Sequence, residues 1–222
     1  MLNLDEFKEL TVYRKDSSAW FRKKADPRFE LSNIPTFEIF WPLLRDPANR
    51  WPTSEHLYQA SKYDSKVQCL PESNPNADPF VRNRIKAEKT ALGAKGTQKC
   101  AVKAGFVRKD WETNEIRIQS MLWVLELKLY WNSQTFGRIL AATGTLPIVE
   151  VSSKSDFWGA KEQPNGNLTG RNVLGKLLMH LRPRMDAVKK GQFTFPDGFL
   201  LPLQRQNILA HSEPLEYATP VD

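Results

Sequence analysis

Residues 51–63 read WPTSEHLYQASKY and predict a helix whose polar face carries a site. Thr53 or Ser54 can cap this helix with a side-chain oxygen, and no Gly or Pro follows before Pro71. At about 100° per residue, four chemically different side chains share or border one stripe of the helix surface. They are a carboxylate, an amide, an amine and a phenol, from Glu55, Gln59, Lys62 and Tyr58.

The length and composition favour one domain. With 222 residues, of which 41% are hydrophobic, the chain can bury one sizeable core. Helical periodicities dominate, so we expect a mainly α, compact single-domain fold with a few short strands. The domain should occupy residues 21–190, between an N-terminal extension at residues 1–20 and a Pro-containing C-terminal extension at residues 191–222.

The longest predicted helix begins at Thr113 or Asn114 and runs to about Trp131. Its core-facing side chains are Ile118, Met121, Leu122, Leu125 and Leu129. Other segments have their own signatures: an exposed loop at residues 70–79, a basic helix at 80–92, a helix at 133–142, a β-rich piece at 146–151 and a helix from about Thr169. Helices therefore form most of the expected core.

The net charge of +7 is concentrated in one part of the chain. Nine Lys and Arg residues lie within residues 82–109, and Glu88 is the only acid before Asp110. A phosphate-rich partner such as nucleic acid would be attracted to this positive potential. A solvated basic helix face is the alternative interpretation.

The cysteines and histidines restrict the chemistry. Cys69 and Cys100 form no CxxC pair and no secretory segment precedes them, so we expect reduced thiols in a cytoplasmic protein, or a nuclear one in a eukaryotic cell, with a single disulfide as the alternative. His56, His180 and His211 lie far apart, so we expect no metal and no cofactor. The apolar run at residues 121–131 is too short for a membrane span, and we expect no membrane partner.

Separated motifs occur in a fixed order along the chain. They are Leu31-Ser32-Asn33, the segment at 51–63, Arg108-x-Asp110-Trp111, Thr143-Gly144, Val149-Glu150, Asp156-x-Trp158-Gly159, Gly166-Asn167-x-x-Gly170-x-Asn172-x-Leu174-Gly175-Lys176-x-x-Met179 and Arg182. This series resembles the NADAR family, which includes riboflavin-pathway N-glycosidases. The resemblance runs from about Phe21 to Arg184. The sequence departs from the short family form at Ile34, in a longer loop at 70–79 and in the C-terminal extension.

The resemblance implies a metal-independent catalytic domain that hydrolyses the bond between ribose C1 and an amino nitrogen. Some members resemble antitoxins that remove ADP-ribose from guanine in nucleic acid, and this is the activity we expect here. An ADP-ribosyltransferase would then be the functional counterpart. The alternatives are hydrolysis of ribosyl-amino-pyrimidine intermediates of riboflavin biosynthesis, and a non-catalytic module that binds ADP-ribose or nucleic acid.

Three residues are the expected catalytic groups. Breaking the C1–N bond needs a carboxylate that stabilises positive charge or activates water, and Glu55 is the first choice. Lys62 can bind phosphate, or can act as an amine nucleophile that forms a Schiff base with ring-opened ribose. Asp156 can serve as a second acid or base. From the pattern alone, Glu55 could equally be a first-turn residue that supports the helix cap.

The expected substrate-binding residues carry amides, hydroxyls, aromatic rings and guanidinium groups. They are Ser32, Asn33, Tyr58, Gln59, Arg108, Trp111, Trp158, Gly159, Asn167 and Arg182. The candidates for phosphate binding are Arg22, Lys23, Lys24, Arg108, Lys176 and Arg182. Structural roles are open for several of them, because Trp158 can pack in a core and Asn167 can belong to a turn.

Overall fold

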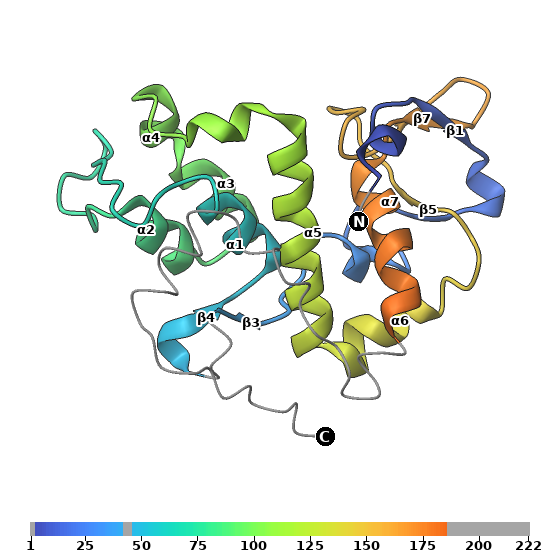
Figure 1. Ribbon diagram of the computed structural model, residues 1–222, viewed down its shortest axis with the longest axis horizontal. Helices are drawn as coiled ribbons and strands as arrows, with labels where there is room; N and C mark the ends of the chain where they lie inside the picture. Colours follow the sequence, from blue (N-terminus) through green and yellow to red (C-terminus); the bar gives the residue numbers. More distant parts are fainter. Residues whose placement is uncertain (1–2, 42–45, 186–222) are drawn as a thin grey trace.

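The computed structural model describes residues 3–41 and 46–185, and the long helix α5 (Asn114–Trp131) stands at its centre (Figure 1). Helices α1 to α4 lie on one side of α5, and α7 lies on the other side with strands β1, β5 and β7 (Figure 1). Because both sides are covered, α5 buries side chains around most of its circumference. The predicted core residues Ile118, Met121, Leu122, Leu125 and Leu129 are all buried, which confirms that prediction.

The helices are short apart from α5. The α-helices have the bounds α1 (Ser54–Ala60), α2 (Val81–Ala87), α3 (Ala91–Thr97), α4 (Lys99–Lys103), α6 (Arg138–Ala141) and α7 (Val173–Leu181). A π-helical turn, η6 (Ser133–Gly137), precedes α6. Single 3-10 turns are η1 (Leu4–Phe7), η2 (Lys15–Ser17), η3 (Phe29–Leu31), η4 (Pro47–Asn49), η5 (Lys109–Glu112) and η7 (Arg182–Arg184).

The strands form three small sheets in the described part of the chain. Their bounds are β1 (Thr11–Tyr13), β2 (Ala19–Phe21), β3 (Ile39–Phe40), β4 (Arg50–Trp51), β5 (Ile148–Glu150), β6 (Lys161–Glu162) and β7 (Leu168–Gly170). The first sheet has the order β1-β7-β6, with antiparallel pairs. Strands β2 and β5 pair in parallel, so that Phe21 lies opposite Glu150, and β3 pairs with β4.

The expected mainly α fold is corrected in two respects. The described chain is a mixed α/β domain, because residues 11–21 and 148–170 supply short paired strands that have no clear alternating pattern. The basic helix expected at residues 80–92 is two helices, since Thr90 accepts a hydrogen bond from the Gly93 amide at 3.0 Å and begins α3. The helix expected from Thr169 begins at Val173, after β7 has paired with β1.

Helix α1 begins as its sequence predicts. The Thr53 hydroxyl accepts a hydrogen bond from the His56 amide at 3.3 Å and lies 2.8 Å from His56 Nδ1. Nε2 of the same ring lies 3.0 Å from the Glu88 carbonyl, which can only accept a hydrogen bond, so Nε2 carries the proton and donates. His56 therefore joins the start of α1 to the segment that leads into α3. The helix ends at Ala60, and Lys62 follows in a turn.

Asn172 and Gly175 fasten α7 to β5. Asn172 has a left-handed backbone (φ 49°), and its side chain accepts a hydrogen bond from the Glu150 amide at 3.1 Å and donates one to the Ile148 carbonyl at 2.8 Å. Gly175 lies so close to the same strand that a β-carbon there would stand 2.1 Å from the Ile148 carbonyl oxygen. The Asn172 and Gly175 motif thus fixes the strand that carries Glu150.

Replacing Gly175 with Ala should strongly destabilise the fold. The added methyl group would force α7 away from β5, since the atom it meets belongs to the backbone and cannot rotate aside. We expect the free energy of unfolding to fall by about 3 kcal/mol, at the upper end for overpacking. Urea unfolding monitored by circular dichroism measures this change as a lower midpoint at constant slope.

Gly96 is the matched control for that substitution. It lies in α3, and a β-carbon there would meet nothing within 4 Å. Gly96→Ala should therefore leave the midpoint unchanged or raise it, because alanine favours the helix by about 0.5–1 kcal/mol. Equal effects of the two substitutions would show that close packing on β5 is not the reason for Gly175.

The described residues contain no helix that is both long enough and apolar enough to cross a membrane.

Candidate active site

A buried row of hydrogen bonds ends on the carboxylate of Glu55. Gln59 Nε2 donates to Glu55 Oε1 at 2.5 Å, and Gln98 Nε2 donates to Gln59 Oε1 at 2.6 Å. The Tyr63 hydroxyl donates to Gln98 Oε1 at 2.9 Å and closes the row. All these donors point towards Glu55, which suits a carboxylate that accepts without donating. Glu55 is thus held in one orientation although only 3% of its surface is exposed.

Lys95 supplies a positive charge beside the same carboxylate. Its Nζ lies 3.4 Å from Glu55 Oε1. The Glu55 side chain is 4% exposed, whereas 49% of the Lys95 side chain is exposed. The ion pair therefore connects the buried carboxylate to the surface of α3.

Glu150 is a second carboxylate in this site, and sequence reasoning did not select it. It ends β5 and is partly buried. Burial raises the pKa of Glu150 to about 7, the positive charge of Lys95 opposes this rise, and the negative charge of Glu55 adds to it. Glu150 can therefore hold or release a proton near neutral pH.

Lys62 lies in the turn after α1, and the pKa of its side-chain amine is lowered. Burial lowers the pKa of Lys62 to about 8; Glu55 opposes this effect, and the positive charges of Arg117 and Lys95 add to it. The amine also lies 5.9 Å from the centre of the Tyr58 ring. Lys62 is consequently still mostly a cation near neutral pH, but its neutral form, which a nucleophilic amine requires, is more populated than in an ordinary lysine.

Aromatic side chains form one wall of the site. The Tyr58 ring centre lies 5.4 Å from that of Trp111 and 5.6 Å from that of Trp158. Phe157 continues the wall, with its ring centre 4.9 Å from that of Trp158. Trp111 and Tyr58 are buried, while Trp158 is partly exposed. The rings are tilted or perpendicular to one another rather than coplanar, and the partly exposed Trp158 is the ring that can offer a face to a base or a sugar.

Arg117 on α5 faces this wall. Its guanidinium carbon lies 4.7 Å from the centre of the Phe157 ring and 6.0 Å from that of Trp158. Arg117 also acts electrostatically on the Tyr58 hydroxyl and on the Lys62 amine, and it favours deprotonation of both. The site therefore contains three cations, Lys62, Lys95 and Arg117, around two carboxylates.

Ser32 and Asn33 are brought to the start of α1 by a buried lysine. Lys128 is fully buried in α5 and donates to the Glu30 and Ser32 carbonyls, each at 2.9 Å. The Asn33 carbonyl then accepts a hydrogen bond from the Glu55 amide at 3.2 Å. Asn33 Oδ1 is buried without a partner among the described residues, so it remains available to a ligand.

Two expected site residues, Asp156 and Arg108, have surroundings that bear on their expected roles. Asp156 is exposed, and its side chain has no hydrogen bond or ion pair among the described residues. Arg108 pairs with Asp110 through both carboxylate oxygens, and its Nη1 donates to the Ser61 carbonyl at 3.4 Å. Glu150 is thus a further candidate for the second acid, while the role of Asp156 stays a prediction, and the ion pair with Asp110 suits a positioning role for Arg108 at the end of α1.

Three further predicted site residues, Arg182, Asn167 and Gly159, lie where their contacts support the fold. Arg182 donates to the Thr143 hydroxyl and to the Leu146 carbonyl, both at 2.9 Å. Asn167 lies in the turn between β6 and β7, where its carbonyl accepts from the Gln163 amide. A β-carbon on Gly159 would stand 2.4 Å from the Glu150 carbonyl oxygen, so Gly159 permits close packing beside β5. None of these contacts places the three residues beside Glu55.

Three residues of the site, Glu150, Lys95 and Arg117, were not predicted, because no sequence pattern connects them to Glu55. Glu150 stands at the end of an apolar strand and within a motif, but nothing in the pattern joins it to a helix 95 positions earlier. Lys95 is the only charged residue of α3, and Arg117 lies near the start of α5, so no pattern of charges marked either position as part of a site. Tertiary packing, rather than spacing in the sequence, brings them together. Among the described residues, no group of three His, Cys, Asp or Glu side chains can hold a metal ion.

Comparisons with known proteins identify the relatives of this chain. A model of the NADAR domain matches residues 17–186. The N-glycosidase YbiA of Escherichia coli is 28% identical over 177 residues, which cover 79% of this chain and 92% of YbiA. The nuclear magnetic resonance structure of YbiA gives a TM-score of 0.54 at 24% identity, covering 82% of this chain and 96% of YbiA, and supports the fold.

Two longer relatives carry riboflavin names. A riboflavin biosynthesis protein of Vibrio vulnificus is 30% identical over 155 residues, which cover 69% of this chain and 36% of that protein. The chloroplastic riboflavin biosynthesis protein PYRR of Zea mays is 33% identical over 165 residues, which cover 73% of this chain and 24% of the maize protein. This chain therefore corresponds to one part of each longer relative.

Proposed function

This chain belongs to the NADAR family, and on that premise we propose that it is an N-glycosidase that hydrolyses a bond between ribose C1 and an amino nitrogen. The observation that carries the proposal is that Glu55, which is buried, and Glu150, which is partly buried, lie close enough for their charges to interact, with Lys95 acting on both. Two carboxylates in different environments are what glycosidic hydrolysis requires. The N-glycosidase name of YbiA supports this chemistry.

Glu150 and Glu55 would have different roles, Glu150 as the acid and Glu55 as the base. Glu150, whose pKa lies near 7, donates a proton to the departing nitrogen as the C1–N bond breaks. Glu55, oriented by Gln59, stabilises positive charge at C1 and accepts a proton from the attacking water. The products are a free amine and a sugar with a hydroxyl group at C1, and the proton on Glu55 returns to solvent. Glu150 is then reprotonated from solvent, which balances the reaction.

Lys62 has two possible roles in this reaction, and they make opposite predictions. As a cation it binds the substrate, which is the role we favour. As a neutral amine it attacks ring-opened C1 and forms a Schiff base, with loss of water or of the amine. We expect borohydride added during turnover to leave the mass of the protein unchanged. A sugar-sized increase in mass at Lys62, absent in Lys62→Met, would establish the covalent route instead.

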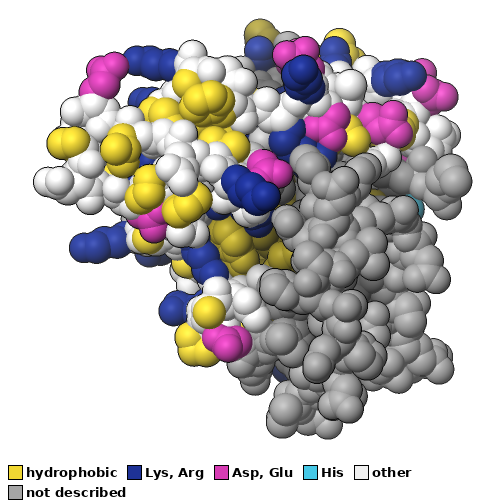
Figure 2. Space-filling model, turned by 60° about the vertical axis from the view of Figure 1, so that its left-hand side comes forward, with side chains coloured by type: hydrophobic (Ala, Val, Ile, Leu, Met, Phe, Trp, Pro, Cys, Tyr) yellow, Lys and Arg dark blue, Asp and Glu magenta, His cyan; other side chains and the backbone are white. Residues whose placement is uncertain are grey.

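ADP-ribosylated guanine in nucleic acid is the substrate we favour. Lys95 pairs with Glu55 and is also half exposed on α3, so the site adjoins a surface with further exposed lysines: Lys89, Lys99 and Lys103. Figure 2 shows the molecule with its α2 and α4 side turned forward, and Lys and Arg side chains stand there among hydrophobic ones. Such a surface suits a nucleic-acid strand, whose phosphates need cations and whose bases need apolar contacts.

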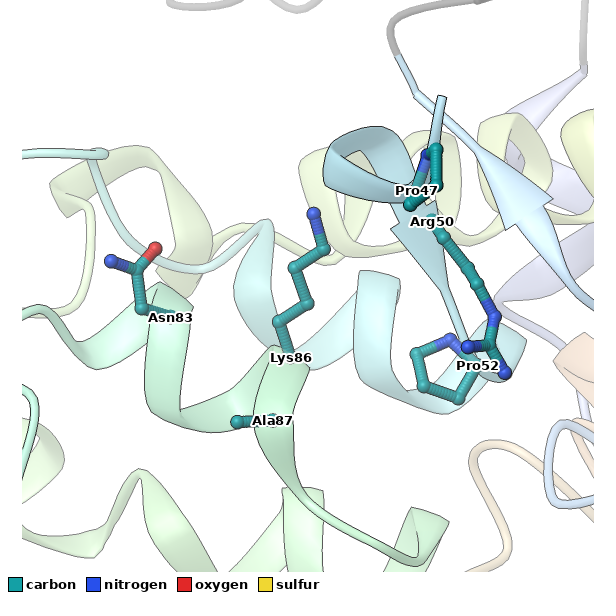
Figure 3. A pocket seen from close by; sticks show the side chains of 6 residues that line it. All are labelled: Pro47, Arg50, Pro52, Asn83, Lys86 and Ala87. Carbon is teal, nitrogen blue, oxygen red and sulfur yellow. The ribbon is translucent and has the colours of Figure 1, made fainter. Parts of the chain in front are cut away.

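A basic pocket near the start of α1 adds to this argument. It has a volume of ≈ 250 Å³ and is lined by Pro47, Arg50, Pro52, Asn83, Lys86 and Ala87. In Figure 3, Asn83 and Lys86 project from α2, and Arg50 and Pro52 lie across from them. Lys86 is held by the Ala48 carbonyl and lies 5.0 Å from the centre of the Trp51 ring. Lys86 is the cation that a flanking phosphate of the strand would meet here, since Arg50 pairs with Glu38 at 2.7 Å.

Ribosyl-amino-pyrimidine intermediates of riboflavin biosynthesis are the second candidate substrate. The names of the Vibrio vulnificus and maize relatives favour them. The small molecule carries the same ribose C1–N bond, so the carboxylate pair would serve it equally. It would leave the exposed lysines of α3 and α4 without a role in catalysis.

The test is to compare both substrates with the same enzyme preparation. An oligonucleotide with ADP-ribosylated guanine and a ribosyl-amino-pyrimidine 5′-phosphate are incubated separately, and the release of the sugar is followed. We expect the higher kcat/KM with the oligonucleotide, and a decrease in it as salt rises. A higher kcat/KM with the pyrimidine would reverse the assignment of the substrate. Binding of ADP-ribose without turnover of either substrate would instead indicate a non-catalytic binding module.

A further inference from the structure

The site contains a guanidinium group that pairs with no carboxylate. Among the described residues Arg117 has no ion pair; its guanidinium donates to Asn114 Oδ1 at 3.2 Å and also interacts with the Tyr58 hydroxyl. Glu55, the buried carboxylate of the site, pairs with Lys95 instead. Arg117 is therefore left with most of its donors free in a partly buried place beside Lys62.

The orientation of Arg117 is nevertheless fixed. The faces of Phe157 and Trp158 hold its guanidinium at 4.7 Å and 6.0 Å from their ring centres. Lys62 and Arg117 carry like charges, and Glu55, the anion that acts on Lys62, is already paired with Lys95 at 3.4 Å, so a further anion would stabilise both cations. The two groups thus mark a place for a ligand with at least one negative charge, next to the aromatic wall.

We propose that Arg117 and Lys62 bind the 5′-phosphate of the substrate ribose. The inference rests on the proposed function for the identity of the ligand. It holds for both candidate substrates, since ADP-ribose carries a diphosphate at this position and the pyrimidine intermediate carries a phosphate. An arginine can donate two parallel hydrogen bonds to a phosphate, and the nearby lysine adds charge. The ribose would then lie between this anchor and the two carboxylates.

Three of the other cations that the sequence offered for phosphate are already engaged, and the remaining three, Arg22, Lys23 and Lys24, are exposed. Arg108 is paired with Asp110, and Arg182 with Thr143 and Leu146. Lys176 donates to the Glu6 carbonyl at 2.7 Å and to the Glu9 carbonyl at 3.3 Å. Arg117 differs from all three, because its contacts are ring faces, the Tyr58 hydroxyl and one amide oxygen, all of which lie in or beside the site.

Arg171 provides a matched control. Its guanidinium carbon lies 5.8 Å from the centre of the same Phe157 ring, and it does not act on Lys62 or Tyr58. Both Arg117→Met and Arg171→Met remove a cation from that ring and keep a long apolar side chain. Only Arg117→Met removes a charge that faces the proposed phosphate.

The experiment measures binding by calorimetry, with ribose 5-phosphate and ribose as probes. The wild type should bind the phosphorylated sugar more tightly, and Arg117→Met should weaken that binding by about 10- to 100-fold, as expected for hydrogen bonds to a charged group. Arg171→Met should change it less than about threefold, and neither variant should alter the binding of ribose. Arg117→Lys should recover part of the loss.

Two results would overturn the assignment of Arg117. One is equal affinity of the wild type for ribose and ribose 5-phosphate. The other is an equal loss in Arg117→Met and Arg171→Met, which would indicate a change in packing. Because these measurements need no turnover, they stay separate from the proposed function: an inactive protein that shows the Arg117 effect would still have a phosphate site, and an active protein without it would still be a glycosidase.

Discussion

Glu55→Gln should reduce kcat by about 10²- to 10⁴-fold while the protein stays folded. The substitution keeps the size of the side chain but removes the negative charge that faces C1. It also presents an amide to Gln59, whose donated hydrogen bond the carboxylate now accepts at 2.5 Å. The loss should fall on kcat, with the affinity for substrate changed little, because the charge acts on the transition state. Single-turnover kinetics with saturating enzyme measures it.

Glu72→Gln is the control for this prediction, since Glu72 is exposed in the loop before α2. It removes one negative charge from the protein and should leave kcat unchanged. A Glu55→Gln enzyme that retains more than about a tenth of the wild-type kcat would contradict the assigned role, because a transition-state charge contributes more than 1.4 kcal/mol. Thermal unfolding of both variants checks that any loss is not caused by misfolding.

Glu150→Gln should remove a pH dependence as well as activity. In the wild type, kcat/KM should decline as pH rises through about 7, because the proton donor is lost above its pKa. Glu150→Gln should reduce kcat/KM by about 10²-fold or more and should lack this decline. The rate profile between pH 5 and about 9 measures both effects. A wild-type optimum between the pKa values of Glu150 and Lys62, near 7 and 8, would instead indicate that a neutral Lys62 takes part.

Glu150→Gln should also increase the stability of the folded protein at pH 8, although it decreases the activity. Burial raises the pKa of Glu150 from 4.5 to about 7, so the folded state favours the protonated form. The contribution of Glu150 is present below pH 4.5 and is lost as pH rises towards 7, which makes the ionised residue destabilising at pH 8. Glu150→Gln should therefore unfold at a higher urea concentration than the wild type at pH 8, and exposed Glu112→Gln should not. An unchanged midpoint at pH 8 would show that Glu150 is well solvated.

The sequence predicted the parts of the fold that local rules determine. Helix α5 has a capping Thr113 and an uninterrupted apolar stripe, and α1 has a capping Thr53. The strands were largely missed, because two or three residues show no alternation and gain their hydrogen bonds from distant partners, as Phe21 does opposite Glu150. Thr90 also began a new helix within a run that looked continuous.

In the site, too, local rules predicted the residues of one helical turn and missed those that tertiary packing brings in. Glu55, Tyr58 and Gln59 were predicted together because one helical turn places them together, and the structure does bring Gln59 onto Glu55. Glu150 interacts electrostatically with Glu55 only because β5 packs against α7, and this packing depends on Asn172 and Gly175. Arg108 looked available for phosphate because its pairing with Asp110 depends on the conformation of their loop.

The most direct measurement is the mass of the products formed by the wild type. An oligonucleotide that carries ADP-ribose on guanine is incubated with the enzyme, and both fragments are analysed by mass spectrometry. Cleavage of the C1–N bond predicts a strand with the mass of the unmodified oligonucleotide and intact ADP-ribose, and Glu55→Gln should give neither. A strand that keeps a ribose phosphate would contradict the account, and so would failure to release sugar from this strand and from the pyrimidine substrate alike.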